Sequence, residues 1–136
     1  MKPTIVLIGG IFILLGILAG AFVAHTLENH LSSQQLTSLK TGVQYQIYHG
    51  LALIIIGFNI AKIKNAKIIY WGLLLGTLLF SGSIYFLALD DIFDSNFGFL
   101  WPLTPIGGSL LIITWSLFVI QFIKLKNSDS IFERYF

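Results

Sequence analysis

Long apolar stretches alternate with short polar connections along the whole chain. The apolar stretches cover about residues 4–24, 43–61, 68–89 and 103–123. Each is close to the ~20 residues that a helix needs to cross ~30 Å of hydrocarbon. The pattern predicts an all-α integral membrane protein in which four spanning helices form one bundle. We expect residues 1–126 to form this single transmembrane domain and residues 127–136 to form a cytoplasmic tail.

The polar residues that precede two of these stretches predict where their helices begin. Ser32 and Gln35 have the spacing of a capping box, so the second helix should start with an amphipathic segment at about residues 33–42. This helix would be longer than the bilayer core, and its first turns should lie at the outer interface or against the bundle. The fourth stretch opens with Thr104-Pro105, which predicts a capping residue followed by proline at the first helical position.

The composition requires lipid as the main solvent of the chain. Hydrophobic residues make up 56% and charged residues 10% of the sequence, whereas soluble domains have ~25% charged residues. The net charge of +2 comes from basic residues that flank the apolar stretches, so we predict no nucleic-acid partner. The chain has no cysteine, which excludes disulfides, thiolate metal sites and covalent attachment of haem.

The charges of the connections predict the orientation of the protein. The connection between the second and third stretches contains Lys62, Lys64 and Lys67, and the next contains Asp90, Asp91 and Asp94. Lysine and arginine in short connections favour the cytoplasmic side. With both termini in the cytoplasm, only Lys40 of the 8 Lys and Arg residues lies outside. We therefore expect a multi-pass protein of the plasma membrane with an N-in, C-in topology.

Small residues at helical spacing predict where helices meet. Gly16 and Gly20 form a GxxxG pattern in the first span, and Gly72 and Gly76 form another in the third. Such patterns let helix backbones approach closely. Gly108 lies in a Gly-Gly-Ser sequence without the lysine of a phosphate-binding loop, so we assign it to packing of the fourth helix. These contacts can lie within one chain or between copies, and we favour the first.

Polar residues follow one face of the second helix. At 100° per residue this face carries Thr41, Tyr45, Tyr48, His49, Ala52, Ile56 and Asn59. His25 leaves the first helix at what we expect to be the same outer depth. Polar residues in membrane spans usually face the bundle and pair with one another. We favour the interpretation that His25, Tyr45 and His49 satisfy one another or a backbone carbonyl and fix the helix register.

A metal or haem site is the second interpretation of these histidines. His25, Glu28, His30 and His49 supply three imidazoles and one carboxylate. The spacing H-x-x-E-x-H does not gather them on one helical face as zinc-enzyme motifs do, and we predict no metal and no cofactor. Two histidines at neighbouring helix ends could still ligate haem axially.

Catalysis and transport are the remaining interpretations. Ser81 and Ser83 have no histidine at their expected depth, so we predict that the protein is not an enzyme. The polar face that ends at Asn59 could line a transport path. However, no span has a charged residue near its centre, as proton and ion relays usually do.

Four sequence segments together resemble a known family. They are GAFVAH at residues 20–25, TGVQYQIYH at 41–49, FSGSIY at 80–85 and TPIGG at 104–108. In this order they resemble the family catalogued as domain of unknown function 423, over about residues 8–120. The resemblance implies a small four-span protein of bacterial inner membranes, with no established activity. The chain departs from the family at Val23, where a small residue is usual.

The segments that carry the resemblance lie mostly at the expected outer ends of the helices. The residues that could converge there are His25, Tyr45, Gln46, His49, Ser83, Tyr85 and Thr104. Our hypothesis is one polar pocket that either fixes the bundle or holds a ligand. We expect a non-enzymatic membrane protein that acts through packing with the lipid bilayer, with a second copy of itself or with another membrane protein. The alternative is binding or transport of a small ligand, lipid or solute through this pocket.

Overall fold

The computed structural model describes residues 1–93 and 96–135, with side chains placed as far as Lys124. In this part of the chain the long helices are α1 (Pro3–Phe22), α2 (Ser33–Asn59), α3 (Ala66–Ala88) and α4 (Leu103–Tyr135). A π-helical turn, Val23–Leu27, continues α1, and short 3-10 turns occur at Ile60–Lys62 and Gly98–Leu100. No strand is present among the described residues, which confirms the all-α fold. Asp94, expected in the acidic connection, lies outside them.

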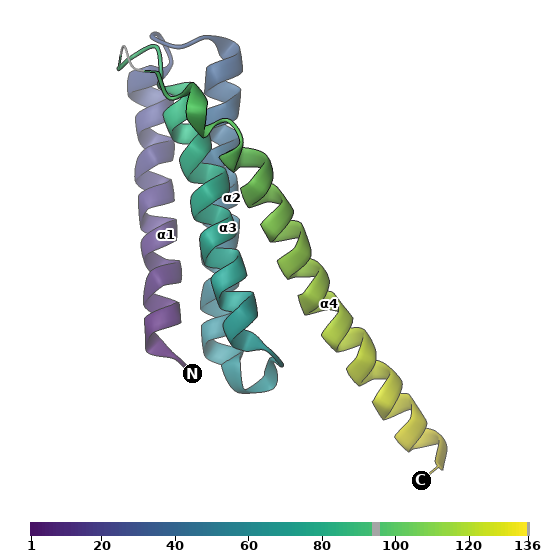
Figure 1. Cartoon of the computed structure of the whole chain (residues 1–136). Helices are drawn as coiled ribbons and strands as arrows, with labels where there is room; N and C mark the ends of the chain where they lie inside the picture. The colour runs from purple at the N-terminus through teal and green to yellow at the C-terminus, as the bar shows by residue number, and fades with distance from the viewer. Residues whose placement is uncertain (94–95, 136) are drawn as a thin grey trace.

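Three helices run side by side, and the fourth diverges from them. Figure 1 shows α1, α2 and α3 as a bundle, while α4 starts beside α3 and leaves at an angle. Both termini lie at the same end as the connection between α2 and α3. In the described part of the chain, four helical segments are long and apolar enough to cross a membrane, which confirms the predicted spans. Helix α4 continues to Tyr135, so the segment expected to be a tail extends the last helix.

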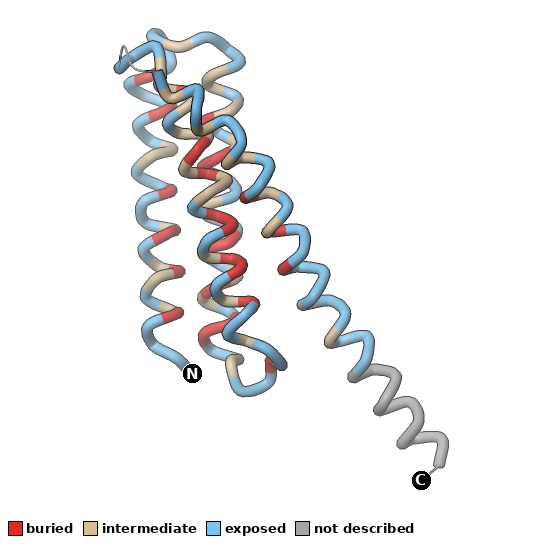
Figure 2. Tube along the Cα trace, in the orientation of Figure 1, coloured by how far each residue is buried: buried red, intermediate tan, exposed pale blue. Residues whose placement is uncertain are grey.

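The surface of these helices is apolar. Leu14 is 58% exposed on α1, Ile55 62% on α2 and Ile112 69% on α4. Figure 2 shows the buried positions on the inner faces of α1, α2 and α3 and few of them on α4. Large exposed apolar surfaces are uncommon on soluble monomers. The outer faces are therefore suited to hydrocarbon.

The predicted capping box at the start of α2 is present. The Ser32 hydroxyl accepts a hydrogen bond from the Gln35 N–H at 3.3 Å, and Gln35 Oε1 accepts one from the Ser32 N–H at 2.9 Å. Gln35 Nε2 also donates to Asp91 at 2.8 Å, which joins this helix start to the connection after α3. The predicted cap at Thr104 is wrong. Because α4 already begins at Leu103, Thr104 lies inside its first turn.

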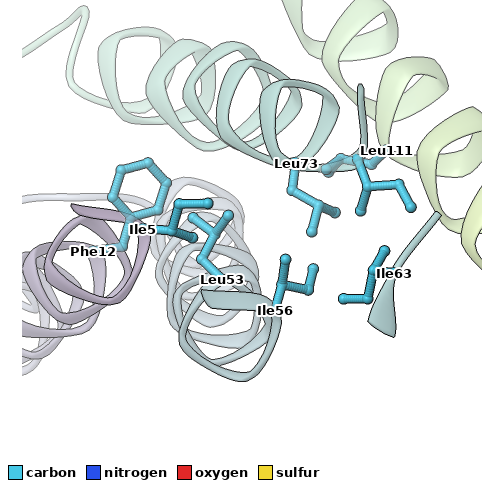
Figure 3. Close-up of a cluster of buried hydrophobic side chains, with 8 residues drawn as sticks. Ile5, Phe12, Leu53, Ile56, Ile63, Leu73 and Leu111 are labelled. Carbon is cyan, nitrogen blue, oxygen red and sulfur yellow. The ribbon is translucent and has the colours of Figure 1, made fainter. Parts of the chain in front are cut away.

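The core consists of two clusters stacked along the bundle. The larger cluster contains Ile5, Phe12, Leu53, Ile56, Ile63, Ile69, Leu73 and Leu111. Figure 3 shows that its side chains come from all four helices and from the connection after α2. The smaller cluster, at the other end, contains Val23, Leu27, Leu39 and Ala88. Val23, the departure from the family pattern, is only 4% exposed and belongs to this second cluster.

Glycines form the contacts between paired helices. A Cβ atom built at Gly16 would lie 2.6 Å from Ile47 Cγ1, and one at Gly20 would lie 3.4 Å from Val43. A Cβ atom at Gly72 would collide with the Thr114 hydroxyl, and one at Gly76 would lie 2.8 Å from Leu111. The two GxxxG patterns therefore pack α1 against α2 and α3 against α4 within one chain.

Candidate functional site

Gln46 joins three helices through its side-chain amide. Its Nε2 donates to the carbonyl oxygen of Phe12 on α1 at 2.9 Å, and its Oε1 accepts from the Tyr85 hydroxyl on α3 at 2.8 Å. Two glycines make room for this arrangement. A Cβ atom at Gly16 would press on the residue next to Gln46, and one at Gly42 would lie 2.8 Å from the Tyr85 ring. Hydrogen bonds of this kind fix helices in register where water cannot compete.

A second polar contact joins the C-terminal end of α3 to the N-terminal end of α4. The hydroxyls of Ser83 and Thr104 are 2.7 Å apart. The Ser83 hydroxyl also donates to the Phe80 carbonyl at 3.0 Å. Because serine has one hydroxyl proton, Thr104 is then the donor to Ser83. Ser83 and Thr104, both predicted site residues, therefore form a contact that is separate from the contact between Gln46 and Tyr85.

His49 forms a third contact, which joins α2 to α4. Its Nδ1 lies 2.7 Å from the carbonyl oxygen of Tyr45, and its Nε2 accepts from Trp115 Nε1 at 3.2 Å. A carbonyl oxygen only accepts and an indole N–H only donates, so both bonds require the neutral Nδ1–H tautomer. The Tyr45 ring stacks on Phe80 at a centroid distance of 4.7 Å. The His49 side chain is therefore fully hydrogen-bonded.

His25 lies apart from these contacts, which corrects the expectation that it meets Tyr45 and His49. It is exposed in the π-helical turn, whose buried residues Val23 and Leu27 pack against Leu39. The part of α1 that lies beside His49 is near Gly9, far from His25 in the chain, because Gly9 faces Gly50. Ten residues of α2 separate Leu39 from His49, or ~15 Å along the axis. The predicted single outer pocket is therefore three separate contacts, and the two histidines are not placed to share one haem iron.

Neither candidate for catalysis or metal binding has the geometry that its chemistry needs. The buried hydroxyl of Ser81 has no hydrogen-bond partner, and the hydroxyl of Ser83 pairs with Thr104, so neither contacts a histidine base. Within residues 1–93 and 96–124, no three His, Asp or Glu side chains gather as metal ligands.

A lateral groove lies between α2 and α4, and the hydrogen-bonded pair His49 and Trp115 forms part of its wall. We call it the α2–α4 groove, and its volume is about 960 Å³. It is lined by Tyr45, Tyr48, His49, Phe80, Gly108, Leu111, Ile112, Trp115, Ser116, Val119 and Ile120. Toward the connection between α3 and α4 it meets a cleft of about 1030 Å³, which shares Phe80, Gly108 and Ile112 with it. Toward the other end it meets a cleft of about 550 Å³, which shares Ile120 with it.

Two functional candidates in this region, Trp115 and Gln121, were not predicted from the sequence. Trp115 follows Thr104 by eleven residues, which is three helical turns, so the same face of α4 carries both polar partners. Gln121 lines the cleft at the groove's far end, and neither polar atom of its buried amide has a hydrogen-bond partner. A glutamine within the last turns of an apolar span was itself a signal, because polar side chains in spans usually serve a function.

These observations define a small integral membrane protein of four spanning helices with a lateral groove. The chain belongs to the family described as "Protein of unknown function (DUF423)", whose model matches residues 19–108. It is 37% identical over 127 residues to the UPF0382 membrane protein YwdK of Bacillus subtilis, covering 91% of this chain and 98% of the relative. It is 38% identical over 124 residues to the UPF0382 inner membrane protein YgdD of Escherichia coli K12, covering 88% and 86%. No solved structure matches the chain significantly.

Proposed function

We propose that this chain is a non-enzymatic protein of the plasma membrane that binds a membrane lipid in its α2–α4 groove. The observation that carries the proposal is the divergence of α4. This helix packs along α3 at Gly72 and Gly76, but it leaves a groove of about 960 Å³ beside α2 that opens sideways. Sites for small ligands have volumes of ~300–1,000 Å³. The groove is therefore large enough for part of a lipid.

The chemistry of the groove favours an acyl chain as its occupant. Its wall is mostly aliphatic and aromatic, with Leu111, Ile112 and Val119 from α4. Two of its polar side chains already have partners within the protein, because His49 is bonded to Trp115 and the Ser116 hydroxyl donates to the Ile112 carbonyl. A polar solute would find few free groups there, whereas hydrocarbon needs none. This argument favours lipid over the solute that the sequence also allowed.

Filling the groove should remove the bound lipid. Val119 lines the groove and is 52% exposed, so Val119→Trp should fill it without disturbing the core. Native mass spectrometry of the wild-type protein released from mild detergent should show a reproducible added mass of one phospholipid. The Val119→Trp protein should lose most of this added mass, because the new side chain occupies the space of the acyl chain.

Ile113→Trp is the matched control for this experiment. Ile113 is 57% exposed on the same helix but lines neither the groove nor its neighbouring clefts. This variant should retain the lipid as the wild type does. A wild-type protein that carries no lipid would reject the proposal. A lipid-free mass equal to a clean multiple of the chain would instead indicate that a second copy covers the groove.

We also propose that both termini lie in the cytoplasm. One cleft beside the connection between α2 and α3 is lined by Lys62, Lys64 and Lys124, and another by Lys2 and Lys67. This connection lies at the end of the bundle that carries both termini, which supports this orientation by the positive-inside rule. The chain has no cysteine, so single cysteines can report the topology. In intact cells, a membrane-impermeant maleimide should label Asn29→Cys, in the connection after α1. It should label Ala61→Cys, at the opposite end, only after permeabilisation, and the reverse pattern would reject the orientation.

A further inference from the structure

The cleft at the termini end of the α2–α4 groove carries positive charge. We call it the lysine cleft, and its volume is about 550 Å³. It is lined by Ala61, Lys62, Ile63, Lys64, Asn65, Ile68, Ile69, Leu117, Ile120, Gln121 and Lys124. None of these lining residues is acidic. The cleft therefore joins three positive charges to an apolar wall.

Within the part of the chain whose side chains are described, nothing neutralises the lysines of this cleft. Among the described residues, no ion pair or hydrogen bond involves the side chain of Lys62, Lys64 or Lys124. Three like charges around one cleft repel one another, and the repulsion is relieved when an anion enters. The charge of the cleft is thus complementary to an anionic group.

Gln121 contributes to the wall of the same cleft. Both polar atoms of its side-chain amide are buried beneath this wall, and neither has a partner. Because these atoms are closed off from the cleft, we assign headgroup selection to the lysines. Asn65, which precedes α3, also lines the cleft and gives this helix no side-chain cap. Uncapped N–H groups at a helix start favour a negative ligand.

The lysine cleft lies next to the apolar groove, at a distance that suits one lipid leaflet. Ile120 lines both spaces, so they are neighbours along α4. One leaflet of hydrocarbon is ~15 Å thick, half of the ~30 Å core. At ~1.5 Å per residue, this length corresponds to about the nine residues of α4 from Lys124 to Trp115. A charged group in the cleft would therefore place an attached acyl chain beside Trp115.

We propose that the lysine cleft binds the phosphate of an anionic phospholipid from the cytoplasmic leaflet, with an acyl chain in the α2–α4 groove. The inference rests on the proposed lipid binding and on the proposed orientation. The groove accounts for binding of a chain, whereas the three lysines account for selection of the headgroup. The protein is then selective for anionic lipid over zwitterionic lipid.

Competition between two lipids with identical acyl chains tests this selection. The wild-type protein in mild detergent is mixed with equal amounts of phosphatidylglycerol and phosphatidylcholine, and native mass spectrometry measures which one is retained. We expect preferential retention of phosphatidylglycerol. The double variant Lys64→Gln/Lys124→Gln should reduce this preference by about fivefold for each lysine removed.

Lys67→Gln is the matched control for the lysine variants. Lys67 lies in the first turn of α3, three residues after Lys64, but lines a different cleft, between α1 and α3. This variant loses one positive charge, as each single lysine substitution does, and should keep the preference. Equal loss in Lys67→Gln and in the double variant would reject the lysine cleft as the site. Equal retention of both lipids by the wild type would reject headgroup selection and leave groove binding intact, whereas retention of neither would reject both.

Discussion

Replacing Gly9 by alanine should separate α1 from α2 and destabilise the bundle by about 1–3 kcal/mol, the usual cost of overpacking. A Cβ atom at Gly9 would lie 2.6 Å from the carbonyl oxygen of Gly50, and one at Gly50 would lie 2.9 Å from that of Gly9. Both obstacles are backbone atoms of rigid helices, which cannot move aside as a flexible side chain can. Unfolding by increasing fractions of sodium dodecyl sulfate in mixed micelles, followed by circular dichroism, measures the loss.

Gly10→Ala is the control for this prediction. No atom lies within 4 Å of a Cβ built at Gly10, and alanine is a better helix former than glycine. Its stability should match or slightly exceed that of the wild type. Gly50→Ala should cost as much as Gly9→Ala, and the double variant should cost less than the sum, since one separation of the helices relieves both contacts. Equal stability of the Gly9→Ala and Gly10→Ala proteins would contradict the proposed close contact.

The spans and the start of α2 were predictable because local chemistry sets them. Bilayer thickness fixes the length of an apolar helix, so the four spans follow from hydrophobic length alone. The Ser32 and Gln35 side chains act on backbone groups only three residues away, so their capping box forms without help from the rest of the fold. At Thr104 the local pattern misled us, because its hydroxyl bonds to Ser83 on another helix.

The candidate site was only partly predictable, because periodicity gives the face of a helix but not its depth against a neighbour. On the predicted polar face of α2, His49 is buried and hydrogen-bonded, whereas Tyr45 and Tyr48 are 40% and 58% exposed. The depth of His25 was wrong, since the glycine contacts set α1 so that Val23 and Leu27 lie beside Leu39. The divergence of α4 from the other helices could not be predicted from the sequence either. It depends on which pairs of helices approach through small residues, a property of the whole packing.

The close approach of α4 to α3 gives the other large expected effect. A Cβ atom at Gly107 would collide with the backbone nitrogen of Phe80 and lie 2.9 Å from the carbonyl oxygen of Gly76. Gly107→Ala should therefore push α4 away from α3 and cost about 1–3 kcal/mol of stability. The contact between Trp115 and His49 should be lost with it, because α4 then no longer presents the indole N–H to α2. Sodium dodecyl sulfate titration measures the stability, and Trp115 fluorescence in a variant without other tryptophans measures the local contact.

The neighbouring residue, Gly108, supplies the sharpest comparison. The sequence analysis assigned packing to Gly108, but a Cβ atom there would lie 3.5 Å from the Phe80 ring, an ordinary van der Waals distance. Gly108→Ala should therefore leave stability nearly unchanged, although it makes the same chemical change one residue away. If Gly108→Ala were the more destabilising of the two, α4 would be rotated about its axis relative to the structure. The α2–α4 groove would then have a different wall, because the same rotation would move Leu111 and Trp115.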